Sequence, residues 1–328
     1  MSKNREIWVV AEQRQGELKR ITLELLGRAL SLAEEKGSQV GVLLMGKSND
    51  NLCRELAQKG ADRIYSIEGD VLELYNPELY SRVVAGLAKE FEPGVILLGA
   101  TVQGSAVSSS VAATLRTGLT AHCCDLSFSE EGRLRQVVPS LEGYYVFVSH
   151  SYPEMASVSP GVFPLLPLEE AGKGEVVNRE LSSIEGCLEI KTSVLSFEKS
   201  VKDAVSLEDA EIIVAGGAGV GSAGWSMVED LAEALGGVVG ATRPAVDEGW
   251  IGHERLIGQS GKNVSPKLFV AVGVSGDPLH LSGVREPELF FAINKNEKAA
   301  IFQFADYGVV GDYRKVLPLL IEAAVNSR

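Results

Sequence analysis

Residues 240 to 308 contain most of the side chains that could take part in chemistry. Apolar runs alternate there with turns, and each turn brings a polar group: the guanidinium of Arg243, the hydroxyl of Ser260, the imidazole of His280 and the carboxylate of Asp306. Because the carboxyl ends of parallel strands meet at one edge of a sheet, we expect these groups to converge on a single ligand. A cation, hydrogen-bond donors and a carboxylate that accepts from a ribose suit a large, flat, anionic nucleotide.

A glycine-rich turn precedes this segment. The sequence GVGSAG at residues 219–224 fits the G-x-G-x-x-G pattern and stands between an apolar strand and a helical pattern. Glycines at such a turn let the backbone approach a pyrophosphate at the start of the helix. The next strand, however, ends in Gly240-Ala-Thr242-Arg243 and not in the acid that would hold a nicotinamide ribose. Nucleotide contact and a simple strand–helix turn both remain open here.

Three other motifs are interpreted as structural. GVLLMGKS at 41–48 fits the phosphate-loop pattern, but its Val-Leu-Leu-Met centre is typical of a strand and not of a loop with free N–H groups. In HCCD at 122–125 neighbouring side chains of an extended chain point to opposite faces, so we predict no metal site. GVSG at 273–276 is not the full serine-nucleophile motif, and no histidine and acid support it.

The elements that must position these groups alternate strand with helix. Short apolar runs predict strands at 7–11, 40–45, 64–67, 95–98 and 211–215, with helical spacing of apolar residues between them. This order is typical of parallel βαβ units. The predicted fold class is therefore α/β, with two domains that are each a doubly wound, mainly parallel sheet.

The stretch from 119 to 195 has a different pattern. We expect antiparallel strands there, appended to a Rossmann-like sheet, at Val137-Val138, Tyr144–Val148, Ala156–Val158 and Leu188–Ile190. Residues 198–209 are charged and lack apolar periodicity, which is typical of a linker. The predicted domains are a nucleotide-binding-like one at 1–197 and a second at 198–328.

Composition limits the possible partners. The chain has 328 residues and a formal net charge of −13, which argues against binding nucleic acid or anionic lipid. No apolar stretch approaches the about 18 residues of a membrane span, and no secretory segment follows Met1. The four cysteines show no disulfide or CxxC spacing, which is typical of free thiols in a reducing compartment. We therefore expect a cytoplasmic protein that, by its apolar stretches, does not span a membrane.

The second half contains five ordered blocks: GATRPAVD (240–247), GQSGK (258–262), SPKLFVAVGVSG (265–276) with His280, AINKN (292–296) and ADYG (305–308). Together these blocks resemble the α subunit of electron transfer flavoproteins. The first half is similar more loosely, through IWVVAEQ (7–13), TLELLGRA (22–29), LLGATVQG (97–104) and TGLTA (117–121).

The resemblance implies FAD as cofactor, held by the C-terminal domain. Arg243 would lie over the flavin ring and stabilise its reduced anion, Ser260 would meet flavin N5, and His280 would lie near the N1/O2 edge. Asn294 and Asp306 would reach the adenosine half. The full expected set of cofactor-binding residues is Thr242, Arg243, Gly258, Gln259, Ser260, Gly261, Ser275, Gly276, His280, Asn294, Lys295 and Asp306.

The same resemblance implies an electron carrier that catalyses nothing by itself. It implies a β subunit as partner in a heterodimer, an acyl-CoA dehydrogenase-type flavoenzyme as donor, and a quinone reductase or another acceptor. An electron-bifurcating variant, fed by NADH and reducing ferredoxin, is a branch of this reading, with its second FAD largely in the β subunit. Two alternatives are a redox-inert scaffold homologue and a standalone NADP-dependent oxidoreductase that holds a 2′-phosphate with Arg243.

Several positions depart from the family pattern. Ala218 and Ser105 and Ser110 stand where arginine is common, Leu279 stands where glutamine is usual, and Asp277-Pro278 replaces Ala-Ile. An acid at 277 would disfavour a reduced, anionic flavin if its side chain pointed inward. We therefore expect a shifted flavin potential or an altered partner.

Overall fold

Two compact units make up the chain. The computed structural model describes residues 6–140, 143–165, 174–185, 187, 190–196, 206–285 and 287–326. Contacts divide the chain into unit 1, Met1–Lys199, and unit 2, Ser200–Arg328. The predicted boundary at 197/198 falls at residues outside the described ranges, and it stays a prediction.

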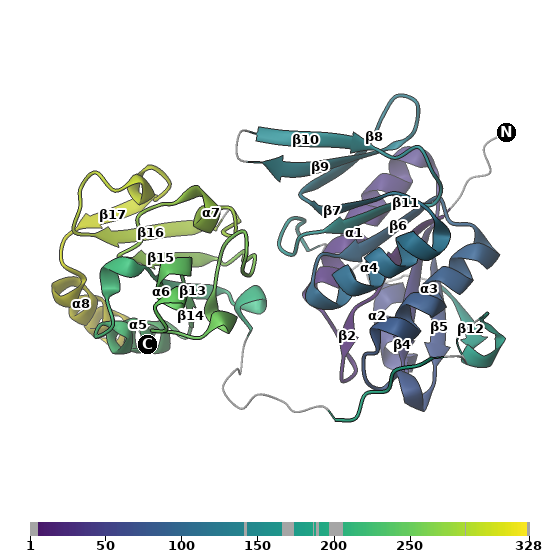
Figure 1. Cartoon of the computed structure of the whole chain (residues 1–328), viewed down its shortest axis with the longest axis horizontal. Helices are drawn as coiled ribbons and strands as arrows, with labels where there is room; N and C mark the ends of the chain where they lie inside the picture. Colours follow the sequence, from purple (N-terminus) through teal and green to yellow (C-terminus); the bar gives the residue numbers. More distant parts are fainter. Residues whose placement is uncertain are drawn as a thin grey trace. The chain divides into compact units, whose positions relative to one another are not determined.

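A seven-stranded parallel sheet forms the centre of unit 1 (Figure 1). Its strands, in spatial order, are β12 (Glu175–Glu180), β5 (Arg63–Glu68), β4 (Val40–Gly46), β1 (Ile7–Val10), β6 (Val95–Gly99), β11 (Glu154–Val158) and β7 (Leu119–Cys123). Every neighbouring pair is parallel. The smaller elements are the hairpin β2 (Gln13–Arg14) and β3 (Glu17–Leu18), η1 (Asp70–Leu72) and η2 (Leu181–Ser183).

Helices cover both faces of this sheet because successive side chains of a strand point to opposite sides. Ile7 and Val9 pack with α1 (Arg20–Lys36) and α2 (Asp50–Gln58). Trp8 and Val10 pack with α3 (Pro77–Phe91) and α4 (Val102–Leu115). The strand order reverses at β1 and β6, and their carboxyl ends border the crevice where doubly wound sheets usually bind ligands.

A separate antiparallel sheet is formed by β8 (Asp125–Phe128), β9 (Leu134–Ser140) and β10 (Gly143–Val148). The expected antiparallel strands at Val137-Val138 and Tyr144–Val148 are confirmed. The third expectation is wrong, because Ala156–Val158 belongs to β11, which pairs in parallel with β6 and β7 inside the main sheet. The fourth, Leu188–Ile190, lies largely outside the described residues.

Unit 2 has a five-stranded parallel sheet with the order β14-β13-β15-β16-β17. The strands are β13 (Ile212–Gly216), β14 (Val238–Ala241), β15 (Leu268–Val272), β16 (Leu289–Asn294) and β17 (Tyr307–Val310). The α-helices are α5 (Trp225–Leu235), α6 (Arg243–Asp247), α7 (Pro278–Leu281) and α8 (Tyr313–Asn326). The 3₁₀ turns are η3 (Leu207–Asp209), η4 (Ala218–Val220), η5 (His253–Arg255) and η6 (Ala300–Gln303).

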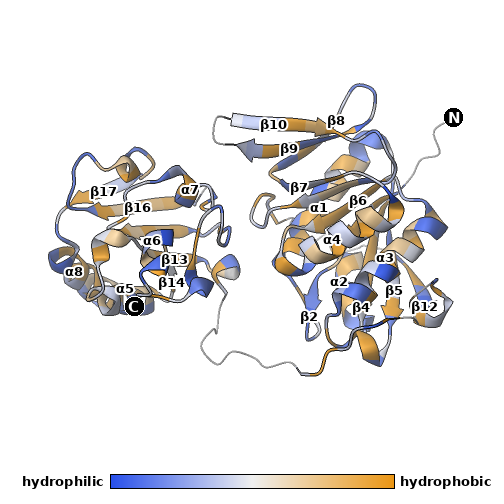
Figure 2. Ribbon diagram, viewed as in Figure 1, coloured by the Kyte–Doolittle hydropathy of each residue, from blue (hydrophilic) through white to orange (hydrophobic). Residues whose placement is uncertain are grey.

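Figure 2 shows hydrophobic residues concentrated along the strands of both sheets. In unit 2, Val214 and Val270 pack against α5 and α8, whereas Ala215 and Phe269 face the opposite core. The predicted α/β class with parallel sheets is confirmed. The predicted linker ends too late, since Leu207 is buried at 2% exposure in this second core. No helix among the described residues is long and apolar enough to cross a membrane.

Candidate functional site

The carboxyl edge of the unit 2 sheet is built by four strands that end side by side. Thr242 follows β14 and donates its backbone N–H to the Gly216 carbonyl at 3.1 Å. Gly217 follows β13 and bonds to Val272, and Gly273 follows β15 and bonds to Ile293. Because all the pairs are parallel, the loops that leave these strands meet at one edge, as the sequence predicts.

Glycines at this edge allow two loops to lie backbone against backbone. A Cβ on Gly217 would stand 2.4 Å from the Gly273 carbonyl oxygen. Gly273 itself has φ +62, and Gly276 has φ +94 with a Cβ position 2.3 Å from the Ile301 nitrogen. Side chains are therefore excluded for steric reasons and for backbone conformation. The result is an edge lined by main chain, which is what a bound dinucleotide requires.

Arg243 and Ser260 meet at this edge although they lie on different elements. The Arg243 guanidinium donates to the Ser260 hydroxyl at 3.3 Å and pairs with Asp247 one helical turn later at 3.0 Å. Its side chain is 62% exposed, so the ion pair contributes little stability. The pair instead orients the guanidinium toward the hydroxyl.

His280 is the buried polar group of the site. It is 5% exposed, and its Nδ1 lies 2.9 Å from the Ile257 carbonyl oxygen. A carbonyl only accepts, so Nδ1 carries the hydrogen and Nε2 of the neutral ring is an acceptor. Burial lowers the pKa of His280, although the Ile257 carbonyl and the charge of Asp277 oppose this shift. Within the described part of the chain, Nε2 is buried without a hydrogen-bond partner.

The turn at 258–261 places Gln259 and Ser260 beside α7, the helix that carries His280. Gly258 has φ +139, and a Cβ there would stand 2.7 Å from the Leu279 carbonyl oxygen. The Gln259 N–H donates to that same carbonyl at 2.8 Å. Asp277 caps the start of α7 by accepting from the Leu279 N–H at 2.8 Å. Its carboxylate is therefore used locally and is exposed.

Asn294 fixes the loop after β15. Its Nδ2 donates to the Val274 carbonyl at 2.8 Å, and its Oδ1 accepts from the Asn296 N–H at 2.9 Å. Lys295 is exposed beside it. The structure thus brings eleven of the predicted residues to or next to the carboxyl edge: Thr242, Arg243, Gly258, Gln259, Ser260, Gly261, Ser275, Gly276, His280, Asn294 and Lys295. Their contacts with a cofactor remain a prediction.

Asp306 does not join this group. It precedes β17, and its carboxylate accepts from the Phe290 N–H at 2.8 Å at the start of β16. Because β16 and β17 are parallel, Asp306 lies at the amino edge, and the expected convergence is wrong for this residue. Asp312, which follows β17, lies at the carboxyl end instead. The sequence could have indicated Asp312, because this residue follows the apolar run Val309-Val310.

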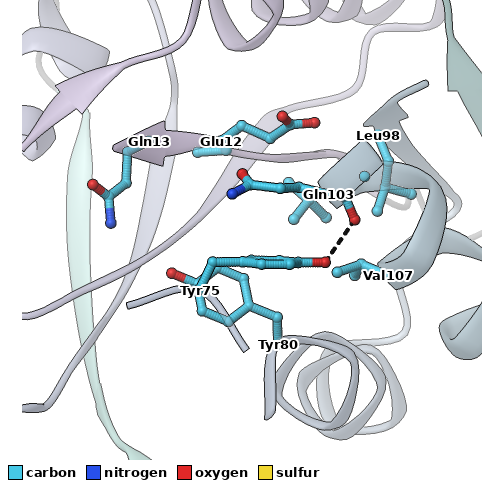
Figure 3. A pocket seen from close by; sticks show the side chains of 10 residues that line it. Glu12, Gln13, Tyr75, Tyr80, Leu98, Gln103 and Val107 are labelled. Carbon is cyan, nitrogen blue, oxygen red and sulfur yellow. Dashed lines mark hydrogen bonds between the residues drawn. The ribbon is translucent and has the colours of Figure 1, made fainter. Parts of the chain in front are cut away.

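Unit 1 has its own pocket at the crevice between β1 and β6 (Figure 3). The pocket is open at its mouth and is lined by the residues after β1, the start of α4 and two tyrosines of the α3 region. The Tyr75 hydroxyl donates to the Gln103 carbonyl at 2.8 Å, and burial raises the pKa of Tyr75 to about 12. The phenol therefore stays neutral and closes the pocket beside α4.

The Glu12 carboxylate occupies the place in this crevice where a bound anion would otherwise lie. The Thr101 hydroxyl lies 2.9 and 2.8 Å from the two Glu12 carboxylate oxygens and accepts from the Gly104 N–H at 2.9 Å. A Cβ on Gly99 or Gly104 would stand 2.5 or 2.7 Å from that carboxylate. The chain's own carboxylate thus lies at the start of α4, where a ligand phosphate would otherwise bind. A phosphate placed there would meet the like charge of Glu12.

The other motifs adopt structural roles. Residues 41–46 of the phosphate-loop match are buried in β4. In the stretch 122–125, Cys123 is buried whereas His122 and Asp125 are exposed. Across the described ranges, no three histidine, cysteine, aspartate or glutamate side chains come together to hold a metal ion.

Unit 2 therefore belongs to the class of dinucleotide-binding α/β domains, with a parallel sheet, a glycine-lined carboxyl edge and convergent polar groups. Residues 7–184 match the model of the electron transfer flavoprotein domain, and residues 206–285 match the electron transfer flavoprotein FAD-binding domain. The chain belongs to the electron transfer flavoprotein family, as an α subunit.

Similar proteins match over almost their whole length. The electron transfer flavoprotein subunit alpha of Thermoanaerobacterium thermosaccharolyticum is 42% identical over 98% of both chains. The subunit alpha of Megasphaera elsdenii is 38% identical, covering 97% of this chain and 95% of its own. The acryloyl-CoA reductase electron transfer subunit beta of Anaerotignum propionicum is 35% identical with the same coverage.

The cofactor of this family is FAD, and unit 2 contains the match to its binding domain. The residues present fit this cofactor. The buried, unpartnered Nε2 of His280 offers a hydrogen bond that the described protein leaves unmade. The cation of Arg243 beside the Ser260 hydroxyl suits a ring that gains negative charge on reduction.

Proposed function

We propose that this chain is the FAD-carrying subunit of a heterodimeric electron carrier. It receives electrons from an acyl-CoA dehydrogenase-type flavoenzyme and delivers them to a second protein, such as a quinone reductase. FAD supplies the redox chemistry when bound in unit 2. The protein's contribution is to hold the cofactor and to set its potential through charge and hydrogen bonds.

The observation that carries this proposal is the polar set at the carboxyl edge of unit 2. Arg243 begins α6, Ser260 lies in the turn at 258–261 and His280 lies in α7. The Arg243–Ser260 hydrogen bond and the close approach of Gly258 to Leu279 bring the three together. We assign Arg243 to stabilising the reduced anionic ring and Ser260 to hydrogen-bonding its N5 side. His280 would take up a proton on Nε2 when negative charge accumulates at the N1/O2 edge, and the resulting N–H would donate to that edge.

A partner surface for the β subunit is offered by β10 in unit 1. This strand has β9 on one side and lies at the edge of its three-stranded sheet, so its outer main-chain groups are available for pairing. Its apolar side chains Tyr144, Tyr145, Val146 and Phe147 are all exposed. Such an exposed apolar edge strand is typical of an interaction site. Replacing Tyr145 or Phe147 by lysine should weaken co-purification with the β subunit.

The test is a visible spectrum of the chain purified together with its β subunit. A yellow heterodimer that releases FAD on denaturation, identified by mass, would support the proposal. An Arg243→Ala variant should then show a lower midpoint potential for flavin reduction. A colourless protein that FAD cannot reconstitute would contradict the proposal and favour the redox-inert scaffold. Tight NADPH binding without flavin would favour the standalone oxidoreductase.

The purified heterodimer also distinguishes a simple electron carrier from a bifurcating one. A simple carrier contains one FAD per heterodimer and takes up electrons at that site. A bifurcating form contains a second FAD, and it reduces ferredoxin only when NADH and a second acceptor are both present. Counting the flavins and running that three-component assay decides between them.

A further inference from the structure

Two side chains at the start of α3 hold a distant, exposed part of the chain. Asn76 caps the helix by accepting from the Glu78 and Leu79 N–H groups, and its Nδ2 donates to the Thr192 carbonyl at 3.1 Å. A single oxygen of Glu78, Oε2, accepts from the Lys191 N–H at 3.0 Å, the Thr192 N–H at 3.1 Å and the Thr192 hydroxyl at 2.9 Å. These bonds span more than a hundred residues of sequence.

These bonds lie where unit 1 ends. Cys187 is the last residue of the unit 1 core along the chain that is fully buried. Residues 191–196 have no regular secondary structure, and Leu195 is 94% exposed. The next side chain along the described residues to be buried is Leu207, which belongs to unit 2. Ile190 still packs against the unit 1 core, whereas Lys191 and Thr192 are exposed and are fixed by hydrogen bonds.

The Glu78 carboxylate is well prepared for this role. Its other oxygen pairs with Arg82 one turn along the helix at 2.9 Å, which orients the group. The bonds from Thr192 and Lys191, followed by the Arg82 charge, hold the pKa of Glu78 below its ordinary value. Charged acceptors make stronger hydrogen bonds than neutral ones.

We propose that Asn76 and Glu78 form a clasp that fixes Thr192 and so sets the residue at which the connection to unit 2 begins. With the clasp closed, residues 193–206, that is 206 − 192 = 14 residues, join the two units. With the clasp open, the connection begins after Ile190, which packs against the unit 1 core, and contains 206 − 190 = 16 residues. At up to about 3.5 Å per residue, the maximal span rises from roughly 50 Å to roughly 56 Å.

Glu78 and Thr192 are then positioning residues for electron transfer. They limit how far a flavin carried by unit 2 can move from unit 1. A longer connection lowers the effective concentration of one unit at the other by about 1.2-fold, since this quantity falls as the −3/2 power of length. This consequence rests on the proposed function, whereas the clasp itself does not.

The clasp is tested by hydrogen exchange on the full chain. In Glu78→Ala, the Lys191 and Thr192 amides should exchange at least about tenfold faster, the effect of losing one hydrogen bond to a charged group. Thr192→Val removes only the bonds of the hydroxyl to Glu78 and Asn76 and should show a smaller increase. Thr114→Val is the matched control, because its hydroxyl bonds only within α4. Arg82→Ala leaves the three clasp bonds in place and should change these two amides little.

Two results would overturn the proposal. One is an unchanged exchange rate at 191–192 in Glu78→Ala. The other is equally faster exchange throughout α3, which would show that Glu78 only stabilises the helix. Trypsin cleavage after Lys191 gives a second readout, and it should accelerate in Glu78→Ala but not in Thr114→Val.

The reach of the connection is tested with a length-matched variant. Two residues, a glycine and a serine, inserted between Val201 and Lys202 reproduce the gain of 16 − 14 = 2 residues while the clasp stays closed. X-ray scattering of the heterodimer should show the same increase in maximal dimension for the insertion and for Glu78→Ala. An increase in the insertion alone would refute the positioning role. Neither measurement needs flavin, so a failure of FAD binding would leave both readable.

Discussion

Tyr313→Phe tests how α8 supports the glycine-rich turn of unit 2. The Tyr313 hydroxyl donates to the Val220 carbonyl at 2.7 Å, and the ring is 8% exposed. A Cβ on Gly224 would stand 2.3 Å from this hydroxyl, so the turn is shaped around it. Phenylalanine keeps the ring packing but leaves a buried carbonyl without its partner. That loss costs about 1–3 kcal/mol.

The assay follows unit 2 alone by its tryptophans. In a Trp8→Phe background, Trp225 and Trp250 are the remaining two of the chain's three tryptophans, and both lie in unit 2. With a urea dependence of about 2 kcal/mol per M, Tyr313→Phe should lower the unfolding midpoint by roughly 0.5–1.5 M. FAD affinity should fall with it, because the turn at 217–221 loses its support.

The control for this prediction is Tyr307→Phe, which changes the same atom on an exposed ring of β17. It should leave the midpoint within the error of the measurement. If Tyr313→Phe shifted the midpoint no more than Tyr307→Phe does, the hydroxyl would not hold the turn, and the reasoning would be refuted.

Three further predictions concern Asp277, Gly276 and Glu78. Asp277→Asn should raise the flavin midpoint potential in a redox titration, because it removes a negative charge close to His280; an unchanged potential would show that Asp277 acts only as the cap of α7. Gly276→Ala should prevent FAD binding in reconstitution assays, because its Cβ would meet backbone 2.3 Å away at φ +94; normal FAD uptake would contradict the packing of that loop. The pKa of Glu78 is depressed by folding, so its contribution is complete above the ordinary value of 4.5 and is lost as pH falls through the folded pKa. The difference in hydrogen-exchange protection of residues 191–192 between the unchanged chain and Glu78→Gln should therefore vanish in acid. A difference that persists at low pH would refute the role of the charge.

The sequence predicted the parallel strands well but not all of their neighbours. Apolar runs such as 40–45 and 95–98 lie in fully buried strands, where burial on both faces requires continuous apolar residues. The run 156–158 was equally visible, yet its pairing with β6 and β7 depends on residues far away in the chain. β12 was missed because its residues are polar and mostly exposed, as an edge strand allows.

The candidate site was predictable to the extent that its groups follow strands. Arg243 and Asn294 stand at strand ends that apolar runs mark clearly, and both lie at the carboxyl edge. Asp306 and Asp312 flank a strand of only four residues, β17, so the choice between them depends on a boundary that the sequence leaves uncertain. The clasp of Glu78 on Thr192 had no local signal, because it joins positions 114 apart.

Each unit contains a parallel sheet of the same class, and the match to an FAD-binding domain lies in unit 2. The carboxyl edges of the two sheets explain this difference. In unit 1 the carboxyl edge is completed by the chain itself, since Glu12 takes the anion position between Gly99 and Gly104. In unit 2 the corresponding edge is left as bare backbone at Gly217 and Gly273, and the imidazole of His280 keeps an unmet hydrogen bond. A buried polar atom without a partner costs free energy, so unit 2 gains stability when a ligand supplies one. Unit 1 has no such deficit at its crevice, where the Thr101 hydroxyl is bonded to Glu12 and the Gly104 N–H donates to that hydroxyl. The carboxyl edge of unit 2 therefore exposes main chain at Gly217 and Gly273 to a ligand. At the corresponding edge of unit 1, the Glu12 carboxylate already occupies that place.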